Sequence, residues 1–429
     1  MSPTFRSLSH PNYRRYAAGS LVSNTGTWMQ RVAQDWLVLV LTGSGAAIGI
    51  TTGLQFLPFL LLSPWAGLVA DRIPKRRLLQ ITNVAMAVPA LVLGVLAVTG
   101  TVQIWHVYVL ALVLGVASAF DAPARQSFVS EIVGPDDLAN AVGLNSASFN
   151  TARLVGPALA GLLIAGFGGG VGGTGWVILL NGLSYVAPVL TLRALDASLL
   201  RTPEPSVRRP GQLREGVAYV RGRPDLLLLL GIVFSAGTFG LNFQMTSALM
   251  ATEVFGKGPA EYGLLGTFLA VGSLTGSLVA ARRVRVRHRL VVGAALAFGA
   301  IEVVAGLAPS YVVFALLCPL LGLSALTMIT SANAHLQLST APEMRGRVMA
   351  LYMMIFIGGT PLGAPFIGWV GEAYGARWTL VVGGLLTMLG TLVASALFLR
   401  GRRVLTGLRA PGSLVPRVWD NQAVARARK

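Results

Sequence analysis

Charged residues are scarce in this sequence. They make up 12% of the 429 residues, about half of the roughly 25% that a soluble domain carries. Hydrophobic residues make up 54%. So little charge cannot cover a water-facing surface of this size, and we expect most of that surface to face lipid.

Cysteine and histidine are also rare, and nucleotide-binding sequence is missing. The single cysteine, Cys318, excludes an internal disulfide. Four scattered histidines give no cluster for a metal or a membrane enzyme, so we expect no metal, no cofactor and no enzymatic activity. The phosphate-binding pattern G-x-x-x-x-G-K-[ST] is absent, which excludes ATP-driven transport by this chain alone.

Acidic residues are outnumbered by basic ones, and the net charge is +18. A nucleic-acid-binding protein gathers its basic residues on one folded face. Here they lie in short loops between apolar segments, as in the cytoplasmic loops of a membrane protein. We therefore expect a lipid bilayer as partner and no nucleic acid.

The apolar segments predict an all-α membrane protein with twelve transmembrane helices. A helix needs about 20 apolar residues to cross the hydrocarbon layer, and the segments lack the alternation of barrel strands. The predicted spans are residues 16–41, 47–69, 78–99, 103–122, 138–166, 176–193, 225–249, 261–281, 290–307, 310–334, 347–370 and 378–399.

The basic residues then predict the orientation of these spans. Thirty of the 34 Lys and Arg residues lie before span 1 or after an even-numbered span, whereas the opposite loops hold only Lys257 and Arg377. By the positive-inside rule, both termini are cytoplasmic. We expect a multi-pass protein of a bacterial inner (plasma) membrane, acting as a monomer.

The longest polar connection divides the spans into two sets of six. We predict an N-terminal half at 1–193, a cytoplasmic linker at 194–223 with a short amphipathic helix at Leu213–Tyr219, a C-terminal half at 224–400 and a basic tail at 401–429. An offset of 207 residues places Pro135 on Pro342, and Gly156 and Gly161 on Gly363 and Gly368. Two related halves are typical of transporters, with the substrate site between them.

The loop between spans 2 and 3 resembles the conserved loop of the major facilitator superfamily, G-x-L-a-D-R-x-G-R-K-x-x-L. The resemblance rests on Gly67, Asp71, Arg72, Lys75 and Arg76, although Pro74 replaces the second glycine. It implies two pseudo-symmetric six-helix bundles and a loop that latches them on the cytoplasmic side. The equivalent loop of the second half keeps Arg282, Arg283 and Arg285 but has no carboxylate.

A second resemblance lies in span 5, where Gly156, Pro157 and Gly161 are similar to the G-P-x-x-G-G motif of facilitator exporters. It implies export by antiport, and ordinary packing of small residues stays open as the alternative. Over its length the chain resembles the transmembrane secretion effector branch, on motifs such as Phe5–Leu8, Thr27–Gln30 and Asp121–Gln126. That branch handles siderophores and drugs.

Charged residues inside spans are functional candidates, because each costs at least about 2.5 kcal/mol to insert. Span 1 presents one polar face at helical spacing, which consists of Ser20, Asn24, Trp28, Arg31 and Asp35. Two interpretations stay open. The face lines the central cavity, with Asp35 binding a proton or cation, or Arg31 and Asp35 form a structural ion pair.

Three other spans carry further candidates. Asn150 and Arg153 share a face of span 5, and Arg153 needs a partner, such as Asp35. In span 7, Asn242 and Gln244 are expected either to contact substrate or to bond between helices. Glu302 in span 9 is expected to reach the interface or to pair locally near the outer helix ring.

These features predict a secondary active transporter. The leading hypothesis is a proton-driven antiporter that exports a small amphipathic organic molecule, siderophore-like or drug-like, by alternating access. The alternative is a proton- or ion-coupled importer of the same fold.

Overall fold

Long helices account for nearly all of the computed structural model, which describes residues 3–201, 212–281 and 287–407. No strand occurs within these ranges. The helices of the first half are α1 (Pro11–Thr42), α2 (Gly45–Arg72), α3 (Lys75–Val98), α4 (Ile104–Ile132), α5 (Pro135–Gly166), α6 (Val171–Ser184) and α7 (Val186–Arg193). A short 3₁₀ helix, η1 (Pro3–Ser9), precedes them, and η2 (Ala197–Leu199) follows them.

The second half contains more interrupted helices. They are α8 (Gln212–Arg221), α9 (Pro224–Ser235), η3 (Ala236–Gly240), α10 (Phe243–Leu249), η4 (Met250–Val254), α11 (Pro259–Ala281), α12 (His288–Gly306), α13 (Tyr311–Ser339), α14 (Pro342–Gly358), α15 (Thr360–Tyr374) and α16 (Ala376–Gly407). The η3 and η4 segments are π-helices. The amphipathic linker helix expected at Leu213–Tyr219 is α8.

Eleven segments of the described residues are long and apolar enough to cross a membrane. Three of them combine neighbouring helices: α6 with α7, α9 through η4, and α14 with α15. The remaining predicted span is α1, whose 32 residues exceed the ~20 that a span requires. Its polar face lowers its hydropathy, so α1 is the twelfth span although composition alone does not select it.

The outer surface of these helices is apolar. On α3, Ile81, Val84, Val88 and Val95 are exposed, and α16 likewise exposes Leu385, Leu389 and Leu392. A soluble monomer rarely exposes continuous apolar surface of this extent. This belt is the lipid-facing surface that the scarcity of charge predicts.

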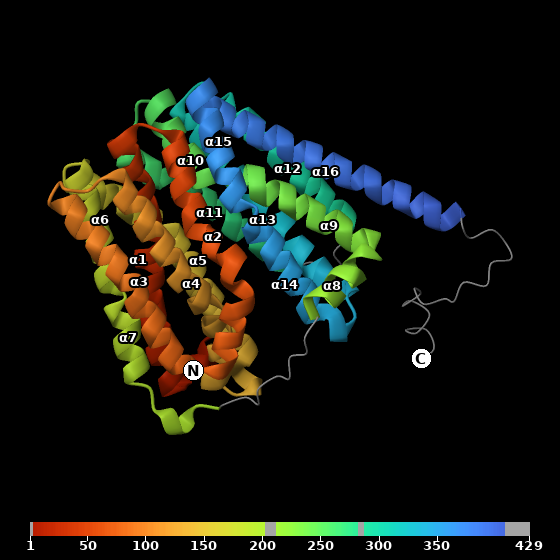
Figure 1. The fold of residues 1–429 in the computed structure, drawn as a ribbon, viewed down its shortest axis with the longest axis horizontal. Helices are drawn as coiled ribbons and strands as arrows, with labels where there is room; N and C mark the ends of the chain where they lie inside the picture. Colours follow the sequence, from red (N-terminus) through yellow and green to blue (C-terminus); the bar gives the residue numbers. More distant parts are fainter. Residues whose placement is uncertain (1–2, 202–211, 282–286, 408–429) are drawn as a thin grey trace.

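The helices form two bundles (Figure 1). In the first, α1 packs against α5 and α6, and α3 against α4 and α6; in the second, α11 packs against α13, and α12 against α16. The bundles meet along two helix pairs, α2 with α15 and α5 with α11. The all-α fold with two six-helix bundles is therefore confirmed.

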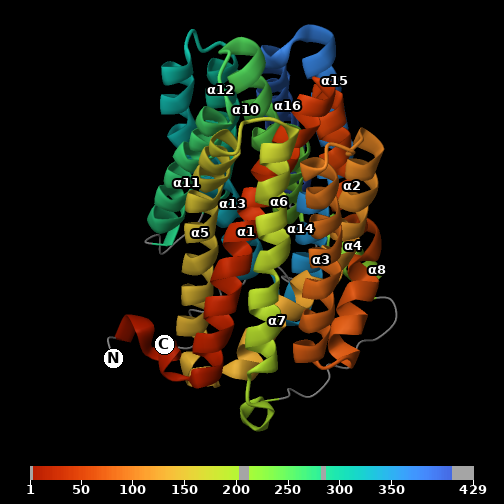
Figure 2. The same cartoon turned by 90° about the vertical axis from the view of Figure 1, so that its left-hand side faces the viewer.

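One end of the molecule carries the N-terminus and the end of α7, at the bottom of Figure 2. We call this end the basic face, since α1 begins there and α2 and α4 end there, next to Arg14, Arg72, Lys75 and Arg76. Proline opens α1, α5, α9 and α14, where its missing N–H costs no hydrogen bond. The other end is called the opposite face.

Candidate functional site

Two arginines and a tryptophan form the most unusual cluster of the first bundle. The guanidinium carbon of Arg31 lies 4.8 Å from the ring centroid of Trp28, and that of Arg153 lies 5.5 Å from the same centroid. Arg31 also lies 5.6 Å from the ring of Phe56 on α2. Stacking of this kind stabilises a desolvated cation by about 2 kcal/mol or more. We call these residues, Arg31, Arg153, Trp28 and Phe56, the Arg31 cluster, and it joins α1, α2 and α5.

Asp35 does not pair with Arg31 or Arg153, which corrects both pairings expected from the sequence. Among the described residues, neither arginine forms a salt bridge with a carboxylate. Asp35 is buried, and its Oδ2 accepts a hydrogen bond of 3.2 Å from the Tyr262 hydroxyl of α11. The Tyr262 ring stacks on Trp36 with centroids 6.0 Å apart. Asp35 therefore connects the two bundles.

Amide side chains fill the space between the Arg31 cluster and the rest of the first bundle. Gln30 accepts a hydrogen bond from Asn181, and the Gln34 amide donates to Gln55 at 3.1 Å. A cavity of about 10 Å³ lies beside them, which is about the space of one water molecule. Its lining consists of Thr27, Gln30, Arg31, Gln34, Gln55, Leu114, Asn181 and Tyr185. The polar side chains of α1 are thus continued by amides of α2 and α6 inside the first bundle.

The remaining polar candidates divide into two groups. Asn24 and Asn150 are half-buried on α1 and α5, and the Asn150 amide donates to the Ser146 carbonyl of its own helix at 2.9 Å. Asn242 is buried, and its amide donates to the carbonyls of Thr238 and Phe239 where the span is broken. Asn242 therefore stabilises the break in its own span, instead of bonding between helices; its contact with substrate stays a prediction. Gln244 is half-buried on α10.

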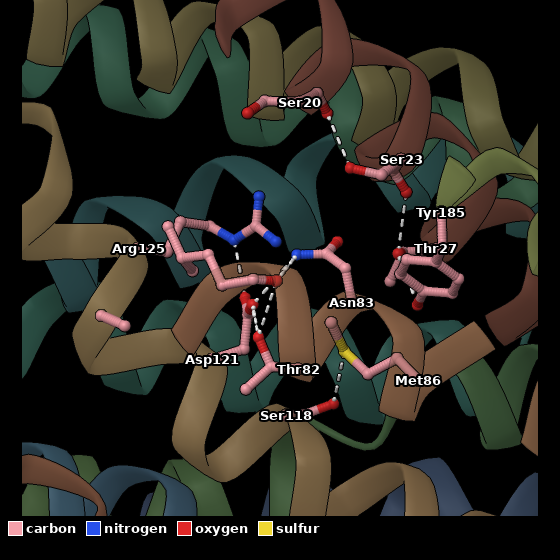
Figure 3. A network of polar contacts seen from close by, with 12 residues as sticks. Ser20, Ser23, Thr27, Thr82, Asn83, Met86, Ser118, Asp121, Arg125 and Tyr185 are labelled. Atoms are coloured by element: carbon pink, nitrogen blue, oxygen red, sulfur yellow. Dashed lines mark hydrogen bonds and ion pairs between the residues drawn. The ribbon is translucent and has the colours of Figure 1, made fainter. Parts of the chain in front are cut away.

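A second buried polar network lies in the first bundle (Figure 3), and the sequence analysis did not predict it. Asp121 on α4 accepts hydrogen bonds from the Arg125 Nε and the Thr82 hydroxyl, both at 2.7 Å. Asn83 reaches the same carboxylate at 3.5 Å. The signal was present, since Asp121 and Arg125 have the same four-residue spacing as Arg31 and Asp35.

The basic residues of the loop between α2 and α3 contact their own bundle. Lys75 pairs with the buried Glu131 of α4 at 2.5 Å. Arg76 donates to the carbonyls of Leu192 and Arg193, each at 2.8 Å, and so caps the end of α7. The other members of the predicted latch lie at the end of α2, where Gly67 is half-buried and Asp71 and Arg72 are exposed. Arg282, Arg283 and Arg285 fall outside the described residues.

Gly156, Pro157 and Gly161 lie at close helix crossings. A Cβ on Gly156 would meet the Trp28 Cβ at 2.6 Å, and one on Gly161 would overlap the Pro259 carbonyl of α11. On the facing helix, a Cβ on Gly263 would overlap the Pro157 carbonyl. Small residues here allow the backbones to approach closely, which is the packing role that the sequence left open.

Glu302 has a different position from the one expected. It is 2% exposed, and its Oε2 has no hydrogen-bond partner among the described residues. Its carboxylate faces Gly240 of η3 and Gly383 of α16. The side chain points into the second bundle instead of toward the interface, because the two glycines leave space for it there.

No group of three or more His, Cys, Asp and Glu side chains in the described ranges is arranged to hold a metal ion.

Known proteins that resemble this chain in sequence are membrane transporters. The family model described as transmembrane secretion effector matches residues 2–407. Among curated proteins, the chain is 24% identical to a staphyloferrin A transporter of Staphylococcus aureus over 88% of this chain and 94% of the relative. It is 28% identical to the multidrug efflux pump Tap of Mycolicibacterium fortuitum, over 87% and 93%.

Solved structures show the same fold. A bacterial homologue of the human lysosomal transporter Spinster, in an inward-facing and occupied conformation, has a TM-score of 0.68 at 18% identity, covering 96% of this chain and 100% of that one. A D-xylose–proton symporter has a TM-score of 0.69 at 14% identity, covering 89% and 96%. The chain belongs to the transmembrane secretion effector family of the major facilitator superfamily, and it is a multi-pass membrane transporter.

Proposed function

We propose that this transporter is a proton-driven antiporter that exports a small amphipathic organic molecule by alternating access. The observation that carries the proposal is the pair of helix crossings, α2 with α15 and α5 with α11, that join the bundles beside the Arg31 cluster and Asp35. Of the named relatives, the staphyloferrin A transporter supports a small organic substrate, and the multidrug efflux pump Tap supports export as the direction.

The proposed orientation puts the basic face in the cytoplasm, with both termini there, and takes residues 1–193 and 224–400 as the moving halves. The positive-inside asymmetry supports this. The interbundle contacts of Gly45, Gly49 and Gly161 then lie near the outside, since α2 begins and α5 ends at the opposite face. This state is closed toward the outside.

Asp35 is the proposed proton site. Its carboxylate accepts a hydrogen bond across the interface between the bundles, so adding a proton there weakens a contact that holds the outer side closed. Proton binding and outward opening are thereby linked. Asp71 and its basic neighbours are the proposed latch of the outward-open state.

Everted membrane vesicles test this proposal. Their interior corresponds to the outside of the cell, so an acid interior is expected to drive uptake of an exported compound, together with proton release. The compound is first found by comparing its accumulation in a deletion strain and in its parent across a panel of metabolites and drugs. Asp35→Asn is expected to abolish the proton-linked uptake.

Two results would argue against parts of the proposal. If no compound in the panel accumulates differently in the deletion strain, export is wrong. If a compound is found but an acid interior drives no uptake into everted vesicles, antiport is wrong. Counterflow in whole cells distinguishes the importer of the same fold, which would bring the compound inward.

A further inference from the structure

Arg31 and Arg153 form no salt bridge with a carboxylate among the described residues, unlike Arg125 and Arg347, and Asp35 is the one carboxylate whose charge acts on Arg31. Arg125 binds Asp121, and Arg347 binds Glu215. The described residues offer Arg31 and Arg153 no such salt bridge, and both guanidiniums stack on the one indole ring of Trp28. Two like charges are thus held together at membrane depth, where each is costly to insert.

Two guanidiniums thus face at most one carboxylate charge, that of Asp35, and the buried carboxylates around them have other contacts. Asp35 accepts the hydrogen bond of Tyr262, Asp121 holds Arg125, and Glu131 holds Lys75. A guanidinium does not lose its proton in a protein, so the cluster cannot become neutral by itself. It remains a site of excess positive charge, which an anion would stabilise.

The surroundings suit an amphipathic ligand. Phe149 makes an edge contact with Trp28, with ring centroids 5.7 Å apart, and 45% of Phe149 is exposed. Asn24 and Asn150 are half-buried on the same two helices, toward the basic face. Aromatic surface and hydrogen-bonding amides therefore lie beside the two cations.

The cluster also lies at the interface between the bundles. Next to Arg153, the Leu154 carbonyl accepts a hydrogen bond of 2.9 Å from Thr267 of α11. Toward the basic face, α5 exposes Ser146, Ala147 and Phe149. Arg153 therefore lies beside a contact between the bundles, on a helix that has exposed positions toward the basic face.

We propose that Arg31 and Arg153 form the anion-binding part of the transport site, and that the substrate is an amphipathic organic anion carrying carboxylates or a similar oxyanion. This inference rests on the proposed function and specifies its substrate class. A guanidinium binds a carboxylate through two parallel hydrogen bonds, while Trp28 and Phe149 pack against the apolar body of the ligand. Organic cations are repelled from the same site.

Binding to the purified full-length transporter in phosphatidylcholine nanodiscs tests the proposal, with naphthalene dicarboxylate as the probe. The uncharged dimethyl ester and a bis(aminomethyl)naphthalene dication are the matched compounds. The dianion is expected to bind more tightly than either. Arg31→Gln and Arg153→Gln are each expected to weaken its binding by about tenfold to a hundredfold, the effect of one charge-assisted contact.

Variants and lipids supply the controls. Arg347→Gln removes an arginine of the Glu215 salt bridge on the basic face and is expected to leave dianion binding unchanged. Arg153→Lys keeps the charge and is expected to recover part of the affinity that Arg153→Gln loses, which a merely misfolded variant would not show. Adding phosphatidylglycerol tests whether a lipid headgroup competes for the site; competition that removes dianion binding would identify lipid as its occupant and overturn the substrate assignment.

The following outcomes would overturn the inference or the proposed function. Wild-type protein that fails to bind the dianion, or binds the dication at least as tightly, overturns the inference, and so do Arg31→Gln and Arg153→Gln variants that keep its affinity within about twofold. The proposed function fails separately, when no compound depends on the transporter for export. If the exported compound found in cells is a cation, export stands and the anion site is wrong.

Discussion

Two tyrosines of the second bundle use their hydroxyl groups differently. The Tyr262 hydroxyl donates to the buried carboxylate of Asp35 across the bundle interface at 3.2 Å. The Tyr311 hydroxyl donates at 2.9 Å to the backbone carbonyl of Glu261 on a neighbouring helix of the same bundle. Removing the Tyr262 hydroxyl leaves a buried carboxylate oxygen of Asp35 without its donor. Removing the Tyr311 hydroxyl affects only a backbone carbonyl.

Tyr262→Phe is therefore expected to lower the free energy of unfolding by about 1–3 kcal/mol, the cost of a buried polar atom left unsatisfied. Tyr311→Phe, the matched control, is expected to cost about 1 kcal/mol or less. Thermal unfolding of the detergent-solubilised variants measures both. Equal losses of stability in the two variants would show that the Asp35 contact has no special role.

The role of individual residues was the hardest part to predict from sequence. Spacing placed Asp35 and Arg31 on one helical face, but it did not reveal that Tyr262, 227 positions later, takes the carboxylate. The buried position of Glu302 beside Gly240 and Gly383 was missed for the same reason. A periodic pattern gives the direction of a side chain, whereas its partner depends on how distant helices cross.

At the scale of helices, glycine determines how closely the two bundles approach. A Cβ on Gly263 of α11 would overlap the Pro157 carbonyl, and one on Gly49 of α2 would overlap the Ala364 carbonyl of α15. By contrast, Gly143 of α5 has no atom within 4 Å of its Cβ position. The same substitution at these positions thus has opposite consequences.

Gly263→Ala is expected to destabilise the closed crossing of α5 and α11 by about 1–3 kcal/mol, as in other overpacked sites. Gly143→Ala is expected to be neutral or to stabilise its helix by up to about 1 kcal/mol. Transport rates and thermal stability in proteoliposomes test the pair. A Gly263→Ala variant that behaves like Gly143→Ala would mean that the helices separate at no cost.

Secondary structure was the part best predicted from sequence. The apolar runs predicted where the spans lie, because a helix surrounded by lipid is apolar along its length. The amphipathic pattern predicted α8, because a helix at a surface has apolar residues at helical spacing. The breaks at η3 and Gly359 were not predicted. The break at η3 depends on Asn242, whose amide satisfies the carbonyl of Thr238, and no local sequence pattern records such a bond.

At the scale of the whole molecule, the closed side is held by contacts between the bundles. At the opposite face, the hydroxyl of Ser44, which caps the start of α2, donates to the Glu372 carboxylate of α15 at 2.7 Å, and both residues are accessible. Cys318, the only natural cysteine, is buried. New cysteines at positions 44 and 372 can therefore be modified selectively.

Joining Ser44→Cys and Glu372→Cys with a short thiol cross-linker is expected to reduce transport by more than about tenfold, because alternating access requires the bundles to separate there. Each single variant treated with the same reagent is the control and is expected to keep its activity. Reduction of a cleavable cross-linker should restore transport. Full activity of the cross-linked double variant would show that this side does not open.

The glycine crossings have a further consequence for the energy supply of the cell. A backbone pressed against a backbone leaves no gap for a file of water molecules, and such a file would conduct protons through the membrane. Where Gly368 meets Gly45 and Gly161 meets Pro259, we therefore expect the transporter to block proton conduction as well. Larger side chains at these positions would admit water, and the resulting leak would dissipate the membrane potential even in cells that contain no substrate.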